Sequence, residues 1–212
     1  LLILLVSGCT PSTHPQTHSV YLDLPHQKIA ANIPSPEYYL GKSAQSTHLE
    51  RSQHYQLKAA ERYIALSKLD EAEKLVTALQ AEFSSITIQI YTQIIRADLM
   101  LAQGYPSETL SILQKIWQPE RLEGDLQRIF YHIRANAYFR NTHIFEAIQD
   151  LVHRSYLLTN QEHIKKNQAQ LWKILSELPI HTLEAYEKHG SSARLQGWIE
   201  LAHLNKRYEK NS

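Results

Sequence analysis

Apolar residues recur along this chain at the spacing of helix turns, and one arrangement of small and bulky side chains occurs three times. In each copy, a small residue is followed by a bulky residue three positions later and by a second small residue twelve positions later. The copies are Ala60, Tyr63 and Ala72; Ala97, Met100 and Thr109; and Ala135, Tyr138 and Ala147. Small residues let two helix backbones approach closely, and a bulky one fills the adjacent groove. The arrangement therefore predicts stacked helical hairpins between residues 55 and 158.

The distance between copies indicates which helical architecture to expect. The steps are 37 (97−60) and 38 (135−97) residues, and tetratricopeptide-like solenoids repeat at about 34 residues. The additional residues are expected in longer loops between hairpins. We predict an all-α fold, a tetratricopeptide-like helical-hairpin solenoid with extra C-terminal helices. The alternative is an irregular helical bundle, which has no reason to keep one inner spacing three times.

Start and stop signals place the individual helices. Ser35 and Asn160 each precede a helical pattern as predicted N-caps, and Asp70 with Glu73 forms a predicted capping pair. Residues 86–90 alternate like a strand, but their apolar pattern continues in helical period and so favours a helix. Six predicted helices have both ends defined, at 36–46, 54–67, 71–82, 125–140, 161–178 and 193–206. Four others are defined at one end or by a signal: one runs from 86 to a stop at Gly104, one starts at 106 with an apolar stripe that reaches Trp117, one starts at 143, and a short one ends at 190.

Composition and charge argue against several classes of function. The chain carries 22 basic and 21 acidic side chains, a formal charge of +1, and they are mixed along its 212 residues. No basic face is therefore expected for nucleic acid. Only one cysteine is present, so neither an intrachain disulfide nor a cysteine-based metal site can form.

The candidate chemical groups do not form a recognisable catalytic pattern. His132, His143 and His153 lie on neighbouring predicted helices without ligand spacing, so we interpret them as ordinary imidazoles and expect no metal or cofactor. Glu177 and Glu184 could be considered as a carboxylate pair for sugar cleavage, but Pro179 separates them and a solvated surface is favoured.

Twelve tyrosines are a notable excess for this length. Tyr63 and Tyr138 occupy repeat positions and are expected in the core. The others singled out, expected to be partly exposed and suited to peptide or protein contacts, are Tyr38, Tyr39, Tyr91 and Tyr131.

The N-terminal residues resemble the lipobox of bacterial lipoproteins. An apolar run, Leu1–Val6, is followed by Ser7, Gly8 and Cys9, and such a run is too short to span a bilayer. The resemblance implies that the Cys9 thiol receives a diacylglyceryl group, that residues 1–8 are removed, and that the new amino terminus is acylated. Because Thr10 is not Asp, it also implies sorting to the outer membrane. The alternative is an ordinary signal peptide with an accidental cysteine.

These features predict three segments. Residues 1–8 are the remnant of a lipoprotein signal peptide. Residues 9–35 are a lipidated, proline-rich tether that contains four of the eight prolines, at 11, 15, 25 and 34, and a fifth, Pro36, follows directly. Its Ser, Thr, His and Gln content is too polar to form a core. Residues 36–212 form the helical domain.

Two tracts near the end of the chain are similar to one family. Asn167 to Leu175 contains Trp172 followed by Leu175, and Leu195 to Leu201 reads Leu-Gln-Gly-Trp-Ile-Glu-Leu. Together with the repeats and the lipobox, they resemble the amino-terminal domain of LpoA-type (LppC) lipoproteins, outer-membrane activators of a class A penicillin-binding protein. Read from the residues alone, Trp172 and Trp198 are expected to anchor the core, and Gly197 to permit close helix approach.

The resemblance implies a non-catalytic regulator of peptidoglycan synthesis, anchored in the outer membrane by Cys9 on its periplasmic side. In the family, an α/β domain similar to periplasmic binding proteins follows and makes the main contact with the synthase. The sequence given ends at Ser212, so the resemblance gives it the anchor and the spacer. One alternative is a general tetratricopeptide lipoprotein adaptor in outer-membrane protein assembly or pilus and secretin biogenesis. Another is an enzyme such as a murein hydrolase.

Overall fold

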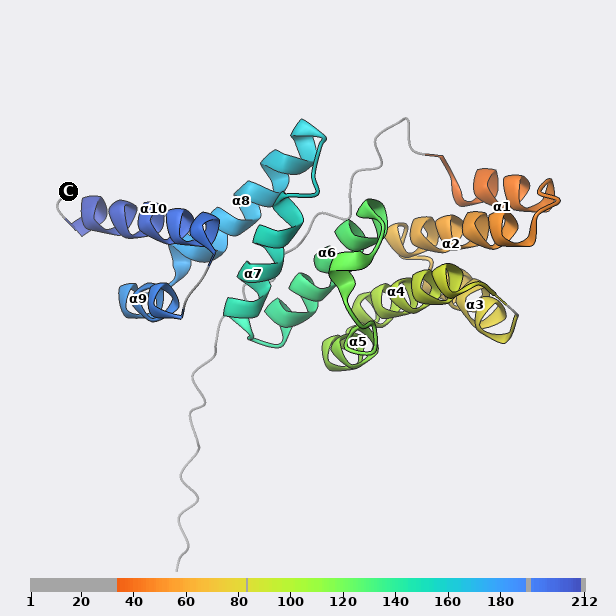
Figure 1. Cartoon of the computed structure of the whole chain (residues 1–212), viewed down its shortest axis with the longest axis horizontal. Helices are drawn as coiled ribbons and strands as arrows, with labels where there is room; N and C mark the ends of the chain where they lie inside the picture. Colours follow the sequence, from red (N-terminus) through yellow and green to blue (C-terminus); the bar gives the residue numbers. More distant parts are fainter. Residues whose placement is uncertain (1–33, 83, 190–191, 211–212) are drawn as a thin grey trace, which may run out of the picture. The chain divides into compact units, whose positions relative to one another are not determined.

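The described part of the chain is built from helices that pack against their neighbours in sequence order (Figure 1). The structure is a computed structural model that describes residues 34–82, 84–189 and 192–210. Within these ranges there is no strand, and the all-α prediction is confirmed. The helices are α1 (Pro36–Ala44), α2 (Leu49–Ala65), α3 (Leu69–Ala81), α4 (Ile86–Ala102), α5 (Pro106–Leu113), a 3-10 turn η1 (Pro119–Arg121), α6 (Gly124–Arg140), α7 (Ile144–Ser155), α8 (Gln161–Glu177), α9 (Ile180–Lys188) and α10 (Ala193–Lys210).

Three consecutive hairpins form the central array. α2 pairs with α3, α4 with α5 and α6 with α7, while the first helices of the hairpins also pack on each other, α2 on α4 and α4 on α6. Each first helix is 17 residues long. This double contact, within a hairpin and between successive hairpins, is the packing of a helical-repeat solenoid.

The repeated small residues occupy equivalent seams, as the sequence predicts. The first small residue of each copy is the twelfth residue of α2, α4 or α6, and the second is the fourth residue of α3, α5 or α7. All six are at most 1 % exposed. In the middle copy, the Thr109 hydroxyl donates to the Ala97 carbonyl oxygen across the seam at 3.2 Å. The twelve-residue spacing thus places two backbones in contact in every hairpin.

The three hairpin turns also share one backbone conformation. Ser67, Gly104 and Thr142 have φ angles of 58°, 90° and 63°, and each lies five positions before the second small residue of its copy. The following backbone N–H, of Lys68, Tyr105 and His143, donates at 2.9 Å to the carbonyl of Tyr63, Met100 and Tyr138 respectively. This bond closes a Schellman-type helix end. The bulky residue of each copy therefore supplies the carbonyl that ends the first helix.

One apolar core runs through the central array. Its buried members extend from Leu57 in α2 to Ala137 in α6, with Tyr91, Ile94 and Phe130 among the side chains that are at most 1 % exposed. Large apolar side chains from successive first helices thus meet in a continuous interior, which is how repeats too small to fold alone acquire a common core.

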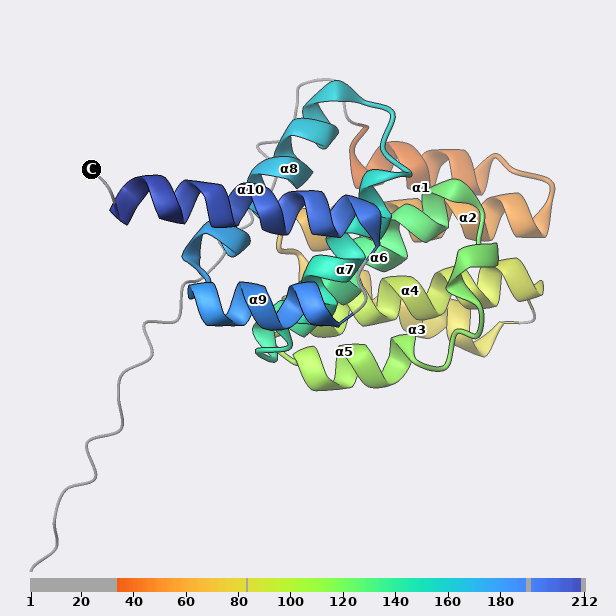
Figure 2. The ribbon, with the colours of Figure 1, turned by 60° about the vertical axis from the view of Figure 1, so that its left-hand side comes forward.

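The hairpin pattern ends after α7. α8 packs on α7 and on α10, and α9 packs on α10 (Figure 2). Pro179 caps the start of α9 in an extended conformation, and the short Leu178–Pro179 link separates α8 from α9. Proline prevents α8 from continuing because it lacks an N–H and restricts the preceding residue. These helices are the predicted extra C-terminal elements.

Helix ends show where local signals were sufficient and where they failed. Ser35 and Asn160 accept the predicted capping bonds, from the Tyr38 N–H and from the N–H groups of residues 162 and 163. α2 begins five residues before the predicted position, and α3 has no side-chain capping bond, so the predicted Asp70 and Glu73 pair is wrong. Trp117 lies beyond the end of α5 and is 82 % exposed, so it does not continue the buried stripe.

Candidate functional site

The predicted lipid-attachment residue, Cys9, lies outside the described residues, as does nearly all of the predicted tether. The lipobox and the segment boundaries at residues 8 and 35 remain predictions. None of the described helices is long and apolar enough to cross a membrane.

A row of polar side chains follows the seam alanines along the first helices of the hairpins. Glu61, Asp98 and Asn136 are each the thirteenth residue of their helix, in α2, α4 and α6. We call these three residues the polar row. Since α2 packs on α4 and α4 on α6, one repeat position places a hydrogen-bonding group on each successive helix. Sequence inspection missed this row, although a polar residue directly after each seam alanine was its signal.

The α2 end of the row is tightly hydrogen-bonded. The Tyr91 hydroxyl donates to one Glu61 oxygen at 2.6 Å, and the Lys58 ammonium contacts the other at 3.1 Å while lying 5.3 Å from the centre of the Tyr91 ring. Burial, followed by the charge of Glu61, raises the Tyr91 pKa far above its ordinary value. Tyr91 is therefore a neutral donor that holds the carboxylate in place.

The middle of the row carries a carboxyl group with altered acidity. Burial is the largest influence on Asp98, and the Glu61 carboxylate adds to it, so that the Asp98 pKa rises to about 7 despite the opposing charge of Arg140. Such a carboxyl can exchange a proton near neutral pH, which is a property of acid–base catalysts and also of buried structural groups. A catalytic role would require a cavity beside it.

Two small cavities of the described part lie elsewhere. One of about 80 Å³ is lined by Ile180, Glu184, His203 and Arg207, and another of about 200 Å³ by Arg194, Gly197, Trp198 and Leu201. Ligand pockets usually measure about 300–1,000 Å³. The geometry of these two cavities therefore fits surface grooves between side chains better than a substrate pocket.

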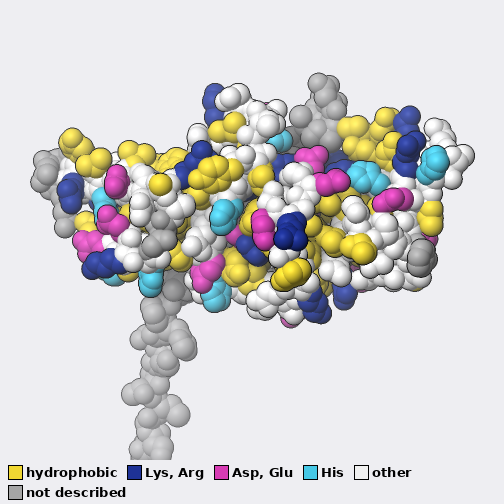
Figure 3. Space-filling model, viewed as in Figure 1, with side chains coloured by type: hydrophobic (Ala, Val, Ile, Leu, Met, Phe, Trp, Pro, Cys, Tyr) yellow, Lys and Arg dark blue, Asp and Glu magenta, His cyan; other side chains and the backbone are white. Residues whose placement is uncertain are grey.

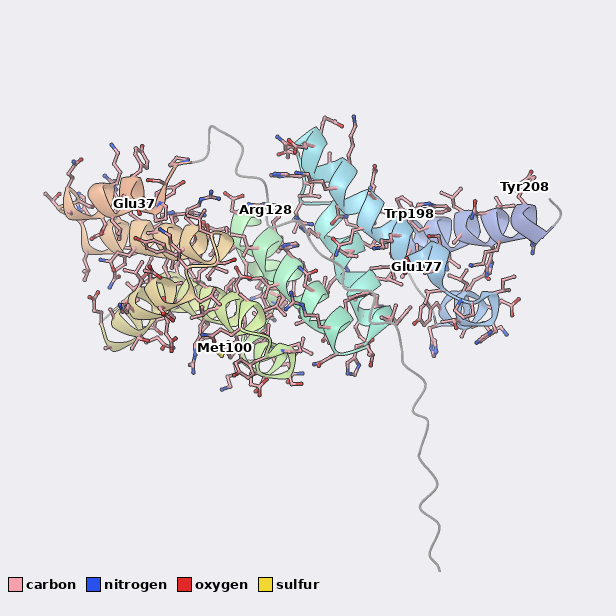
Figure 4. The ribbon with its side chains drawn as sticks, turned by 180° about the vertical axis from the view of Figure 1, so that it is seen from behind. Glu37, Met100, Arg128, Glu177, Trp198 and Tyr208 are labelled. Carbon is pink, nitrogen blue, oxygen red and sulfur yellow. The ribbon has the colours of Figure 1, made fainter. Side chains whose placement is uncertain are left out.

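The groups considered as catalytic or metal-binding do not converge. Glu177 is exposed at the end of α8 (Figure 4). Glu184 is exposed on α9. His132 is half-buried in α6, whereas His143 and His153 are exposed. Within the described ranges, no group of three or more His, Cys, Asp or Glu side chains is arranged to hold a metal ion.

The expected aromatic surface is different from the one in the structure. Tyr91 and Tyr131 are only 1 % and 6 % exposed, so the prediction that they are partly exposed is wrong, whereas Tyr38 is 51 % exposed. The repeat tyrosines, Tyr63 and Tyr138, are partly buried against the core. These four tyrosines thus contribute to packing, Tyr91 and Tyr131 as buried residues and Tyr63 and Tyr138 as partly buried ones.

The Gly-Trp tract of α10 is part buried and part exposed, with Leu195 and Ile199 only 1 % and 0 % exposed. Trp172 and Trp198 are half-buried, and Gly197 is exposed, with nothing within 4 Å of where a Cβ would stand. The expectations that both tryptophans anchor the core and that Gly197 permits close approach are therefore wrong. Leu201, Leu204 and Tyr208, farther along α10, are 49 %, 50 % and 73 % exposed, and Tyr208 lies near the end of the helix (Figure 4).

Acidic and basic side chains are interspersed on the face shown in Figure 3, and apolar side chains appear between them. No extended single-sign patch is present there. This face matches the balanced charge of the sequence.

Comparisons with known proteins agree on one group. A model of the family described as "LppC putative lipoprotein" matches residues 29–212. A protein of Mannheimia succiniciproducens called "Penicillin-binding protein activator LpoA" is 27 % identical over 169 residues, which are 79 % of this chain and 28 % of that protein. One of the same name from Haemophilus ducreyi is 23 % identical over 205 residues, 95 % of this chain and 34 % of its own length. The chain thus spans about a third or less of these curated relatives.

Solved structures share the fold. The amino-terminal domain of Escherichia coli LpoA has a TM-score of 0.72 at 19 % identity, covering 84 % of this chain and 79 % of that one. Full-length LpoA from Haemophilus influenzae has a TM-score of 0.70 at 20 % identity, covering 83 % of this chain and 32 % of that one. At such identities the likeness establishes the helical architecture alone.

Proposed function

Because this chain belongs to the LppC family of lipoproteins, we propose that it is the helical part of a penicillin-binding protein activator and regulates peptidoglycan synthesis without catalysing a reaction. Its task is to hold and position the synthase-contacting part of the activator. The single observation that carries this proposal is the family match, which extends over residues 29–212 and so includes every described helix.

The architecture supports a role in reach and docking. Repeat arrays grow along one direction as hairpins are added, and their exposed surfaces suit protein contacts. The central array spans three hairpins with a continuous core, followed by α8 to α10. A rigid helical array of this kind is suited to act as a spacer.

The anchor is proposed from the sequence. Acylated Cys9 would fix the chain to the inner leaflet of the outer membrane, on the periplasmic side, and residues 10–35 would tether the helical domain. Three acyl chains exceed the two signals needed for stable anchoring. This assignment accords with the description of the family as lipoproteins.

A non-catalytic role is favoured by the relatives and by the site. The relatives are named as activators of a penicillin-binding protein. The Asp98 carboxyl, whose pKa is about 7, owes that shift to burial and to the charge of Glu61, and neither described cavity adjoins it. We assign it a structural role.

The experiment uses the lipidated chain in a Gram-negative envelope, alone and fused to the remainder of a full-length LpoA such as that of Haemophilus influenzae. After cross-linking and affinity capture, the fusion is expected to recover a class A penicillin-binding protein, and the chain alone to recover less. The remainder of LpoA without this chain is the control for reach. A fusion that carries Cys9→Ser is the control for anchoring.

Two outcomes would reject the proposal. Capture of no cell-wall synthase by the fusion would exclude the activator role. Selective capture of a β-barrel assembly or secretin component would favour a general lipoprotein adaptor instead.

A further inference from the structure

The junction of α6, α7 and α8 contains a half-buried arginine, Arg154, that lacks a carboxylate partner among the described residues. Arg154 of α7 donates from Nη1 to the Asn167 side-chain oxygen at 3.0 Å, while its Nε is buried and has no hydrogen-bond partner. Asn167 is itself 1 % exposed and is held by the Leu151 carbonyl at 3.0 Å. The guanidinium is thus fixed in place by a neutral group that cannot compensate its charge.

A second arginine in the same hairpin shows what a compensated site looks like. Arg134 of α6 donates from Nε and Nη2 to the two oxygens of Asp150, both at 2.7 Å. This side-on edge is the pair of donors that matches a carboxylate or phosphate. In Arg154, the Nε of the corresponding edge is unpaired.

Three further basic groups, Arg128, His132 and His163, interact electrostatically with Arg154. Arg128 of α6, which is 28 % exposed in its side chain, has only a 3.4 Å contact with Asp125, whose carboxylate is 84 % exposed. His132 of α6 places Nε2 3.5 Å from the Asn136 amide, and its Nδ1 is buried without a partner. His163 on α8 is half-buried. Two orphaned nitrogens at one junction require an explanation, because buried polar groups are almost always paired.

The electrostatics of the junction are one-sided. Burial and then the charge of Arg128 lower the Arg154 pKa to about 10. Burial, Arg154, Arg128 and His163 together lower the His132 pKa to about 3. The other charged groups that face His163 are Lys166 and Glu162, which are paired with each other at 2.7 Å and mostly exposed. Positive charge therefore exceeds negative charge at this point.

We propose that the α6–α7–α8 junction binds a small oxyanion, a phosphate or carboxylate group, through Arg154 and Arg128 with His163 at the rim. A water molecule could satisfy one orphaned donor, but it could not neutralise two guanidinium groups. Arg128 lies near the amino-terminal end of α6 (Figure 4). Its side chain is partly exposed and can contact a ligand that enters from solvent. The proposal does not depend on the activator role.

The test measures thermal unfolding and calorimetric binding of the full chain with sodium phosphate, sodium acetate or sodium chloride at equal ionic strength and pH. Phosphate at ten times its Kd is expected to raise the Tm by about 3–6 °C, and chloride to leave it unchanged. A response to phosphate alone assigns a phosphate group, and a response to acetate as well assigns oxyanions in general.

Variants connect the response to the junction. Arg154→Met should abolish it, while Arg51→Met, at an exposed position on α2, should respond as the parent does. If Arg154→Met fails to fold, Arg128→Gln at the half-exposed rim should weaken phosphate binding at least about tenfold. NMR titration should also show the His163 pKa rising on binding. Absence of any effect of phosphate or acetate beyond that of chloride, or an equal effect in the folded junction variants, would overturn the proposal.

Discussion

The shared turn conformation of the three hairpins leads to a prediction whose sign differs between copies. Ser67, Gly104 and Thr142 all have positive φ angles, of 58°, 90° and 63°. Only glycine adopts this region without a steric penalty, and a β-branched residue such as threonine is uncommon there. Thr142→Gly should therefore stabilise the third hairpin, and Gly104→Ala should destabilise the second.

The magnitude follows from two opposing terms. A side chain in the left-handed region costs about 1–2 kcal/mol, whereas glycine makes the unfolded chain more flexible and so costs about 0.4–1 kcal/mol. The difference is a gain of about 0.5–1 kcal/mol for Thr142→Gly and a similar loss for Gly104→Ala. No clash adds to the second value, because a Cβ at Gly104 would meet nothing within 4 Å.

Urea unfolding followed by circular dichroism, at one pH and with equal m-values, measures these differences. Gly197→Ala is the matched control, since this glycine lies inside α10 with open space around it, and alanine there should gain about 1 kcal/mol from helix propensity. A stabilised Gly104→Ala protein together with a destabilised Thr142→Gly protein would refute the assignment of equivalent turns.

Three other perturbations test the packing and the electrostatics. Asp150→Asn should lower the free energy of unfolding by about 3–5 kcal/mol, because it leaves a mostly buried arginine without its carboxylate, and chemical denaturation would measure this; a loss below about 1 kcal/mol would contradict the account. Tyr91→Phe removes the 2.6 Å bond to Glu61 and should cost about 1.5–3 kcal/mol, whereas an unchanged midpoint would show that this bond is unimportant. Asp98 and His132 should affect the pH dependence of stability in opposite directions. Folding raises the Asp98 pKa from 3.8 to about 7, so its contribution to stability is complete below pH 3.8 and is lost as pH rises through 7. Folding lowers the His132 pKa from 6.5 to about 3, so its contribution to stability is complete above pH 6.5 and is lost as pH falls through 3. Asp98→Asn should therefore remove a fall in the free energy of unfolding between pH 3.8 and 7, and His132→Gln should remove a rise between pH 3 and 6.5. Changes of the same sign in both variants would contradict these directions.

The hairpin array was predictable because its signal is periodic and local. The seam at Ala97 and Thr109 could be read from the sequence, since the same spacing recurs three times and close helix packing demands small residues there. Ser35 and Asn160 were predictable as caps because one side chain satisfies adjacent backbone donors.

Features that depend on several distant residues were not predictable in the same way. Trp198 is a large apolar residue of the kind expected in a core, but its exposure depends on where α8 and α9 pack around α10. Tyr91 was expected to be partly exposed, yet its burial depends on α2 supplying Glu61 as an acceptor. The unpaired Nε of Arg154 depends on how α8 places Asn167 against α7. Contacts of this kind join residues that are far apart in the chain, so they produce no regular spacing that a single sequence could show.

The most direct test of the central claim is a comparison of peptidoglycan products with and without a synthase. The purified chain, and its fusion to the remainder of a full-length LpoA, would be incubated with sacculi alone and with a class A penicillin-binding protein and its lipid-linked substrate. The account predicts no released muropeptides from sacculi alone, and greater cross-linking only when the fusion and an active synthase are both present. Release of muropeptides by the chain alone, or no effect of the fusion on the synthase, would contradict it.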